Sequence, residues 1–348
     1  MENEQVKKHG RTGKYILRAL LILLETLALL LLGALGAIYI FVKGPSDTAA
    51  RLFVHSTKET SAIGFLPDIF CSEEEINAIM NAEEQTEAVA TDLSLINISD
   101  AASGVVTDEY GFTDDDGDGI ILQEVSGEGY TGYMMIVLDP SRVILGTDPA
   151  SSGGRGYTVE EFAKMYDAVA AINGGAFEDA GGQGNGSMPE GLVVNNGVHY
   201  GGGVKQGFAG IDGDHILHVG CRSGQDAKDE NIMYGASYGP VLVQNGEMMS
   251  EATLESGVNP RTAIGQRADG AFLLLVIDGR QVVSLGATYM DEAEIMLDFG
   301  AVNAVNMDGG SSSMMWYNDG YVNNCASVIG IRPIPTAFVV LKQTEGSR

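Results

Sequence analysis

The chain has 348 residues, of which 45% are hydrophobic and 19% are charged, so it is long enough to bury a sizeable core. Its 47 glycines and 9 prolines exclude a collagen-like or proline-rich disordered chain and indicate many tight turns. The formal net charge of −27 argues against nucleic acid as a partner, because a phosphate backbone needs a basic surface.

The N-terminus has the composition of a membrane anchor. Residues 19–42 contain a single charged residue, Glu25, and a helix of this length, at about 1.5 Å per residue, spans roughly 36 Å. Because Lys and Arg are frequent in residues 1–18, we expect a cytoplasmic basic tail, a span that contacts the lipid bilayer, and an extracytoplasmic body. The alternative is a cleaved signal peptide, for which Ala34-Leu35-Gly36 offers a weak cleavage site.

Residues 43–102 have the pattern of a helical, acidic stalk. Ser72 is followed by three glutamates, an arrangement that is typical of a helix start. The next stretch, residues 81–92, is polar and acidic and predicts a solvated helical spacer. We therefore expect this region to hold the following domain away from the anchor.

From residue 103 the pattern changes to short apolar runs between glycine-rich turns, which predicts strands. Thr158 and Thr288 each have an acidic residue three positions later, which is a capping box, and they predict helices over residues 158–170 and 288–300. The fold class expected is α+β, with a mixed, largely antiparallel sheet and a few packed helices. The predicted strands are Met134–Leu138, Leu192–Val194, Ile216–Val219, Val241–Val243, Phe272–Ile277 and Phe338–Leu341.

Each of the two predicted helices continues into a short buried strand and then into a polar residue on a double-glycine turn. The turns are Asn173-Gly174-Gly175 and Asp308-Gly309-Gly310, the second followed by Ser311, Ser312 and Ser313. Small residues leave backbone N–H groups exposed, so the Asp308 turn could cradle an anion or an oxyanion. The alternative is an ordinary Asx turn.

Two arginines and a second carboxylate lie next to the ends of predicted strands. Arg261 and Arg332 each lie beside a proline just before a strand and could clamp a phosphate or carboxylate, unless they pair with the many acidic side chains. Asp278 follows the strand Phe272–Ile277, and two carboxylates in one site could divide the roles of acid, base and nucleophile. The alternative for Asp278 is a glycine-assisted turn.

An acidic loop is the one candidate for a cofactor site. Asp114, Asp116 and Asp118 have the D-x-D-x-D-G spacing of a calcium loop. The twelfth position is Val125, and Glu124 lies one place off the position where an EF-hand requires glutamate. The sequence therefore allows Ca²⁺ here, with a solvated acidic turn as the alternative.

Several ordered segments resemble the phosphodiester glycosidase family, and the chain looks like a bacterial, membrane-anchored branch of it. The resemblance covers roughly residues 103–345, with Ala176 standing where the family often has an aromatic residue and Ser311 where it often has a third glycine. The segments that carry it are Asn173–Phe177, Gly239–Val243, Pro260–Gly265, Asp278-Gly279, Asn306–Ser312 and Arg332-Pro333.

The resemblance implies a hydrolase that cleaves between the anomeric carbon and the phosphate of a sugar 1-phosphodiester. Asp308 and Asp278 would be catalytic, and Asn173, Arg261, Ser312, Arg332, Gly309 and Gly310 would bind an anionic glycan or sugar phosphate. With the predicted anchor, this indicates an enzyme of cell-envelope or exopolysaccharide glycans. The alternatives are a non-catalytic glycan-binding module and a membrane-tethered envelope-assembly protein.

Overall fold

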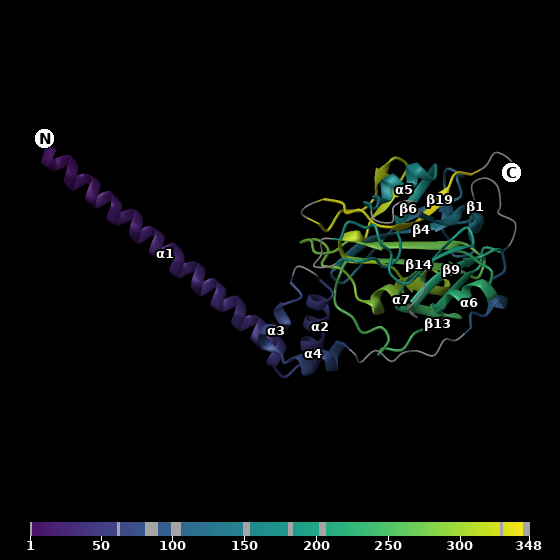
Figure 1. The fold of residues 1–348 in the computed structure, drawn as a ribbon, viewed down its shortest axis with the longest axis horizontal. Helices are drawn as coiled ribbons and strands as arrows, with labels where there is room; N and C mark the ends of the chain where they lie inside the picture. The colour runs from purple at the N-terminus through teal and green to yellow at the C-terminus, as the bar shows by residue number, and fades with distance from the viewer. Residues whose placement is uncertain are drawn as a thin grey trace.

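The computed structural model describes residues 2–60, 63–80, 90–98, 106–148, 154–179, 184–201, 207–327 and 330–343. A long N-terminal helix, α1 (Glu2–Lys43), projects from a body of sheets (Figure 1). Its segment Lys14–Lys43 contains an 18-residue window with a mean hydropathy of 2.4 and is, among the described residues, the one helical segment long and apolar enough to cross a membrane. A signal sequence near the N-terminus passes the same test of length and hydropathy.

The largest sheet has seven strands in the order β13-β12-β16-β14-β15-β4-β3, and its described strand pairs are all antiparallel. Its three central strands are buried along their whole length because helix and sheet cover both faces. The strands are β3 (Ile120–Gly127), β4 (Tyr130–Val137), β12 (Val241–Gln244), β13 (Glu247–Met248), β14 (Arg261–Arg267), β15 (Phe272–Ile277) and β16 (Ala301–Asn306).

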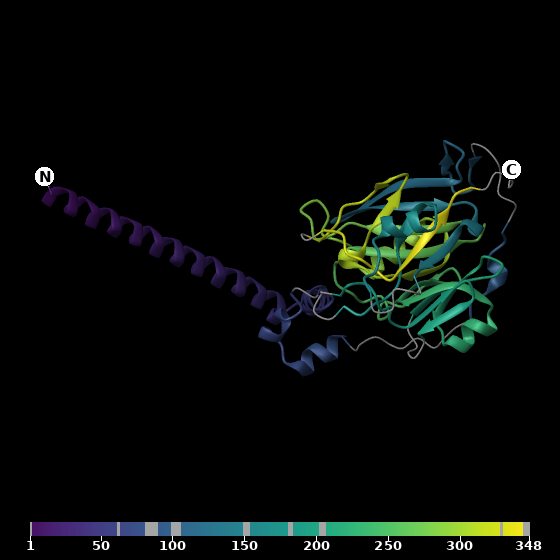
Figure 2. The ribbon, with the colours of Figure 1, turned by 45° about the horizontal axis from the view of Figure 1, so that its top comes forward.

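Two five-stranded antiparallel sheets pack with the first sheet. Ile172, Val219 and Val305, one from each of the three sheets, belong to a single buried cluster, so the sheets share one core. The second sheet, with α6 (Gly224–Asp229), lies at the lower edge of the body in Figure 2. Its order is β10-β9-β11-β7-β8, with β7 (Leu192–Asn195), β8 (Val198–Gly201), β9 (Gly207–Asp212), β10 (Leu217–Cys221) and β11 (Ile232–Tyr238).

The third sheet has the order β18-β17-β6-β19-β5. A separate pair, β1 (Val106–Thr107) with β2 (Thr113–Asp114), completes the described strands. The α+β class predicted from the sequence is confirmed, with antiparallel pairing throughout the described strands. The strands of the third sheet are β5 (Val143–Thr147), β6 (Ala168–Asn173), β17 (Met315–Tyr317), β18 (Gly320–Tyr321) and β19 (Thr336–Leu341).

Both predicted capping boxes are present, at Thr158 before α5 (Val159–Met165) and at Thr288 before α7 (Tyr289–Asp298). The first helix is shorter than predicted, because the chain reverses at Asp167, whose φ is 47°, and enters β6 at Ala168. The alanines of β6 lie between β17 and β19, so burial in a sheet overrides the preference of alanine for helix.

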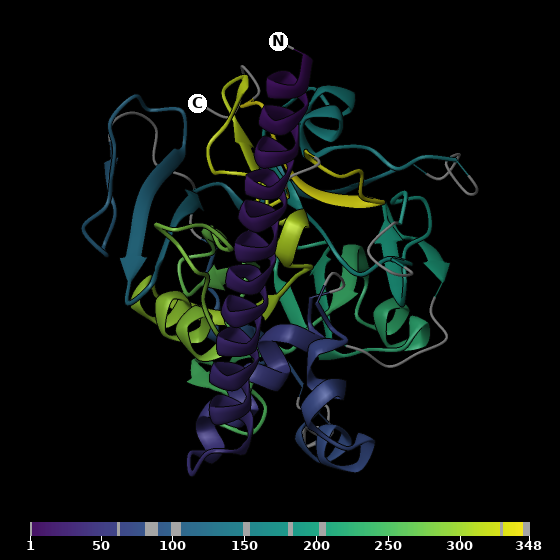
Figure 3. The same cartoon turned by 90° about the vertical axis from the view of Figure 1, so that its left-hand side faces the viewer.

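The region predicted as a stalk contacts the body through the end of α2 and through residues 92–97. It contains α2 (Asp47–Lys58), α3 (Leu66–Phe70), α4 (Glu73–Met80) and a 3₁₀ turn, η1 (Leu93–Leu95). Figure 3, viewed from the side on which α1 projects, shows α2, α3 and α4 at the base of α1. The Asn97 amide donates to the carbonyl of Ala268 at 2.7 Å, so the end of this region also lies on the body. Residues 81–89 of the predicted spacer lie outside the described residues.

The topology collects several strand ends at one edge of the large sheet. Because β14 is antiparallel to β15 and β16, the start of β14 lies beside the ends of its two neighbours. The end of β6 reaches the same place from another sheet, since the Asp308 amide donates to the carbonyl of Gly174 at 3.1 Å. Arg261 at the start of β14 and Asp308 after β16 therefore line the same cavity.

Candidate active site

A cavity of about 160 Å³ opens at this edge. It contains five residues predicted for the site, Asp308, Gly309, Gly310, Arg261 and Arg332. Three other predicted residues, Asn173, Asp278 and Ser312, are buried outside its lining. The complete lining is Glu59, Asp179, Tyr238, Asn259, Arg261, Arg280, Tyr289, Asp308, Gly309, Gly310, Ser311 and Arg332.

Asp308 is one of three carboxylates that line the cavity, with Glu59 and Asp179. Its Oδ2 atom is buried and has no hydrogen-bond partner among the described residues. Burial raises the pKa of Asp308 to about 6, although Ser312, Arg332 and the Gly309 amide act in the opposite direction. A carboxylate of this kind is ionised at neutral pH and poorly solvated, which suits a base or a nucleophile.

Asn173, predicted to bind substrate, is bonded to the main chain at Asp308 and does not line the cavity. Its Nδ2 donates to the carbonyl of Asp308 at 2.6 Å, and its Oδ1 accepts from the Thr262 hydroxyl at 2.8 Å and the Met314 amide at 3.2 Å. The Asn173 side chain thus ties β6, β14 and the Asp308 turn together. Ser312 is likewise buried beside Asp308, where its hydroxyl lowers the pKa of the carboxyl.

The two glycines after Asp308 are required by close approaches. A Cβ at position 309 would lie 2.8 Å from the carbonyl oxygen of Pro260. Gly310 has a φ of 63°, and a Cβ there would lie 3.3 Å from the guanidinium of Arg280. The glycines therefore let the turn approach both the β14 entry and an arginine.

Arg332 lies in the cavity as predicted, paired with Asp179. Its NH1 and NH2 atoms are 2.8 and 2.7 Å from the two carboxylate oxygens of Asp179, a bidentate arrangement. The guanidinium also lies over the ring of Phe177, 4.7 Å from its centroid. This pairing holds Arg332 in one orientation beside Asp308.

Arg280 was missed in the sequence, although it directly follows the predicted Asp278-Gly279 segment. Its NH2 donates to the Thr60 hydroxyl at 2.9 Å and to the Asn259 Oδ1 at 3.0 Å, both neutral oxygens. Unlike Arg261 and Arg332, it forms no ion pair with a carboxylate in the part of the chain that the structure describes. Arg280 is therefore the cavity cation most available to an anionic ligand.

Asp278, the second carboxylate predicted to be catalytic, is buried and does not line the cavity, although Arg280, two residues later, does. Its carboxylate accepts hydrogen bonds at 3.0 Å from Asn323 Nδ2, from the Asn324 amide and from Asn324 Nδ2. Asn323 also donates to the Ser313 carbonyl. Asp278 therefore has the contacts of a residue that fastens the segment after β18.

Removal of the Asp278 carboxylate is expected to destabilise the protein. Asp278→Ala leaves three donors unpaired, which corresponds to a loss of roughly 2–4 kcal/mol in the free energy of unfolding. Thermal denaturation would measure the loss, and enzyme assayed well below the new midpoint should keep activity within about 10-fold. A variant with unchanged stability and no activity would instead make Asp278 catalytic.

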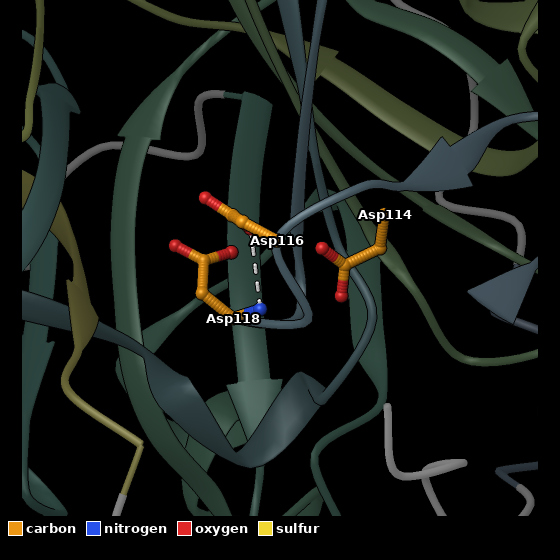
Figure 4. A group of neighbouring side chains, drawn as sticks. All are labelled: Asp114, Asp116 and Asp118. Carbon is orange, nitrogen blue, oxygen red and sulfur yellow. Dashed lines mark hydrogen bonds between the residues drawn. The ribbon is translucent and has the colours of Figure 1, made fainter. Parts of the chain in front are cut away.

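The acidic loop brings Asp114, Asp116 and Asp118 together (Figure 4). One ligand oxygen from each lies within 4.8 Å of the others, which matches two Ca–O distances of about 2.3–2.6 Å. The loop is not an EF-hand, because the chain enters β3 at Ile120, where Val125 is buried and Glu124 exposed. Three carboxylates without a bidentate glutamate fit a weak calcium site.

We propose that this cluster binds Ca²⁺ with a Kd in the range of about 10⁻⁴–10⁻³ M. Calcium at about ten times Kd should then stabilise the fold by about 1.4 kcal/mol in thermal denaturation. Asp116→Asn should abolish that shift, whereas Asp139→Asn, which changes a carboxylate outside the cluster, should preserve it. An identical shift in both variants would place calcium elsewhere.

Three cavity residues had weak signals or none in the sequence. Asp179 follows the Asn173–Phe177 segment by two positions, and Asn259 directly precedes the Pro260–Gly265 segment, so both had a local signal. Glu59 had none that distinguishes it from other acidic residues. The cavity combines three arginines with three carboxylates, a polar lining of the kind found at the sites of enzymes.

Comparisons with known proteins agree with the site of an enzyme. Residues 166–341, half of the chain, match the family described as phosphodiester glycosidase. The chain therefore belongs to the phosphodiester glycosidase family.

Curated relatives align with just over half of this chain. The N-acetylglucosamine-1-phosphodiester alpha-N-acetylglucosaminidases of Bos taurus and Homo sapiens are 31% and 30% identical over 54% of it, and this covers 39% and 40% of their own lengths. The prophage-derived protein YomE of Bacillus subtilis is 30% identical over 55% of this chain and 30% of its own length. The chain thus spans well under half of each of these relatives.

Solved structures share the fold. The catalytic domain of the zebrafish N-acetylglucosamine-1-phosphodiester alpha-N-acetylglucosaminidase, auto-inhibited by its pro-peptide, superposes with a TM-score of 0.54 at 22% identity. That match covers 64% of this chain and 82% of the zebrafish domain. A hypothetical protein from Synechocystis gives a TM-score of 0.51 at 17% identity, over 70% of this chain and 64% of its own.

Proposed function

We propose that the protein is an extracytoplasmic hydrolase that cleaves the bond between the anomeric carbon and the phosphate oxygen of a sugar 1-phosphodiester. The observation that carries the proposal is the cavity, which the carboxylate of Asp308 lines together with three guanidinium groups, its Oδ2 atom having no hydrogen-bond partner among the described residues. Membership of the phosphodiester glycosidase family supports the same reaction.

The arginines account for the leaving group. Arg280, which has only neutral partners among the described residues, would bind the phosphodiester, with Arg332 at the other side of the Asp308 turn. As the bond to the anomeric carbon breaks, its electron pair stays on the phosphate oxygen, and the guanidinium groups stabilise the added charge. A phosphate monoester leaves readily, so less help from a general acid is needed than for an alcohol.

Asp308 accounts for the attack on the sugar. Its carboxylate could take a proton from water, whose oxygen then bonds to the anomeric carbon, or bond to that carbon itself before water releases the sugar. Both routes require the ionised form. Both yield free sugar and a phosphate monoester that keeps all of its original oxygens.

A binding module for anionic glycans is less well supported. Burial of an unpaired carboxylate costs stability, and a negative charge repels an anionic ligand. A binder would therefore gain nothing from Asp308, whereas a glycosidase requires a carboxylate at the anomeric carbon.

The location and the substrate class form part of the proposal. The apolar segment Lys14–Lys43 supports a membrane anchor or a signal sequence. With the basic residues on its N-terminal side, we place residues 1–18 in the cytoplasm and the body outside. Substrates would then be sugar phosphodiesters of cell-envelope glycans or exopolysaccharides.

The proposal is tested by incubating full-length protein in detergent with a panel of sugar 1-phosphodiesters, including N-acetylglucosamine 1-phosphodiesters, the substrates in the names of the mammalian relatives. Release of free sugar by the wild type, and its loss in Asp308→Asn, is the expected result. Binding of panel members without release of sugar would favour the glycan-binding module.

A further inference from the structure

The C-terminal end of α2 reaches into the cavity from the region predicted as a stalk. Glu59, the residue that ends α2, accepts at Oε1 from the Gly257 amide at 3.0 Å. Its Oε2 accepts from Asn259 Nδ2 at 2.8 Å and from Arg261 NH2 at 3.1 Å. A single carboxylate about 200 residues away in sequence thus binds three groups, of which Asn259 and Arg261 line the cavity.

The next residue binds a second arginine. The Thr60 hydroxyl accepts from Arg280 NH2 at 2.9 Å and lies 3.3 Å from the Asn259 Oδ1. Arg280 and Arg261 repel one another, and this repulsion together with burial lowers the pKa of Arg280. A negative charge at Glu59 offsets the repulsion, so Glu59 and Thr60 can hold both guanidinium groups in place.

The contact between α2 and the body is closely fitted. Gly257 packs on Ser56 so tightly that a Cβ would lie 2.2 Å from the Ser56 Cα, and the Val258 amide donates to the Ser56 hydroxyl at 2.9 Å. About one turn before Ser56 in α2, Arg51 forms a bidentate ion pair with Glu255. Several independent contacts therefore fix the position of Glu59.

The charge of Glu59 is well supported. Burial raises its pKa, but His55, Arg261 and the Gly257 amide outweigh that effect, and the pKa lies below the ordinary value. Glu59 is therefore ionised across the neutral range. Its charge is directed at Arg261 and Asn259.

We propose that Glu59 is a positioning residue of the active site, which orients Arg261, Asn259 and, with Thr60, Arg280 toward the phosphate of the substrate. The segment 47–60 is on this account a part of the enzyme, so the catalytic unit begins before the region that resembles the family. This inference rests on the proposed function for its kinetic test but not for its binding test.

The test compares full-length Glu59→Gln with Glu75→Gln, the same change at an exposed residue of α4. Glu59→Gln should lower kcat/KM for a sugar 1-phosphodiester about 10- to 100-fold, with a raised KM, and weaken binding of inorganic phosphate in calorimetry about 5-fold. Glu59→Asp should restore part of kcat/KM and part of the phosphate affinity, and Glu75→Gln should change neither quantity. Thr60→Val removes the neutral contact with Arg280, together with the hydroxyl's bonds to Ser56 and Asn259, and leaves the charge of Glu59 in place, so it should give a smaller loss of the same kind.

Other outcomes overturn the proposal. Higher activity or tighter phosphate binding in Glu59→Gln would make Glu59 an inhibitory occupant of the cavity. Unchanged kinetics and phosphate binding with a lower Tm would make its role purely structural. If the wild type hydrolyses no phosphodiester but binds phosphate in a Glu59-dependent manner, the proposed function fails and the positioning role stands.

Discussion

Asp308→Asn is expected to lower kcat for release of the sugar by at least about 1,000-fold while the protein stays folded. Asparagine keeps the shape of the side chain but can neither accept a proton from water at neutral pH nor bond to the anomeric carbon. The assay is release of free sugar from a sugar 1-phosphodiester. Asp319→Asn is the matched control, because it makes the same change at an exposed turn residue. Near-full activity of folded Asp308→Asn would remove Asp308 from the mechanism.

The same carboxyl should set the pH dependence of activity. Since Asp308 acts in its ionised form and its pKa is raised to about 6, kcat/KM should fall about tenfold per unit as the pH drops below that value.

Stability should depend on pH in the opposite direction. A pKa raised from 3.8 to about 6 on folding means that Asp308 favours the folded state at low pH and that this contribution is lost as pH rises through 6. Since one pKa unit corresponds to about 1.36 kcal/mol, Asp308→Asn should raise the free energy of unfolding by up to about 3 kcal/mol at pH 8. The gain should vanish near pH 4.

The second large effect is expected at Arg280. Arg280→Met should lower kcat/KM about 100- to 1,000-fold, because it removes the cavity guanidinium that has no carboxylate partner among the described residues. Arg280→Lys keeps the charge but loses the planar guanidinium, so its kcat/KM should lie between those of the wild type and Arg280→Met. The control is Arg155→Met, since Arg155 is exposed and pairs with Glu161 outside the cavity.

The split between kcat and KM makes this prediction specific. If Arg280 binds the phosphate equally in the ground state and the transition state, the loss appears in KM, and if it stabilises the leaving group, the loss appears in kcat. An Arg280→Met variant with unchanged kcat and KM would show that the phosphate binds elsewhere, with Arg332 the remaining candidate.

The local parts of the fold could be predicted because they depend on neighbouring residues. Capping boxes at Thr158 and Thr288 and short apolar runs mark helix starts and strands. The Asp308 turn was identifiable for the same reason, since a buried strand, a carboxylate and two glycines follow one another directly.

The direction in which a polar side chain points at a strand end depends on distant partners. Asp308 and Asp278 have nearly the same local pattern, yet Asn323 and Asn324 hold Asp278 away from the cavity. Glu59 enters the cavity because α2 packs on residues 255–258, about 200 positions later in the chain. No local pattern in the sequence encodes either contact.

The most direct test of the proposed reaction is hydrolysis in H₂¹⁸O, followed by mass spectrometry of both products. Cleavage between the anomeric carbon and oxygen should place ¹⁸O in the released sugar and none in the phosphate monoester, and Asp308→Asn should abolish the signal. Label in the phosphate monoester would mean that water attacks phosphorus, which contradicts a glycosidase in which Asp308 acts at the anomeric carbon.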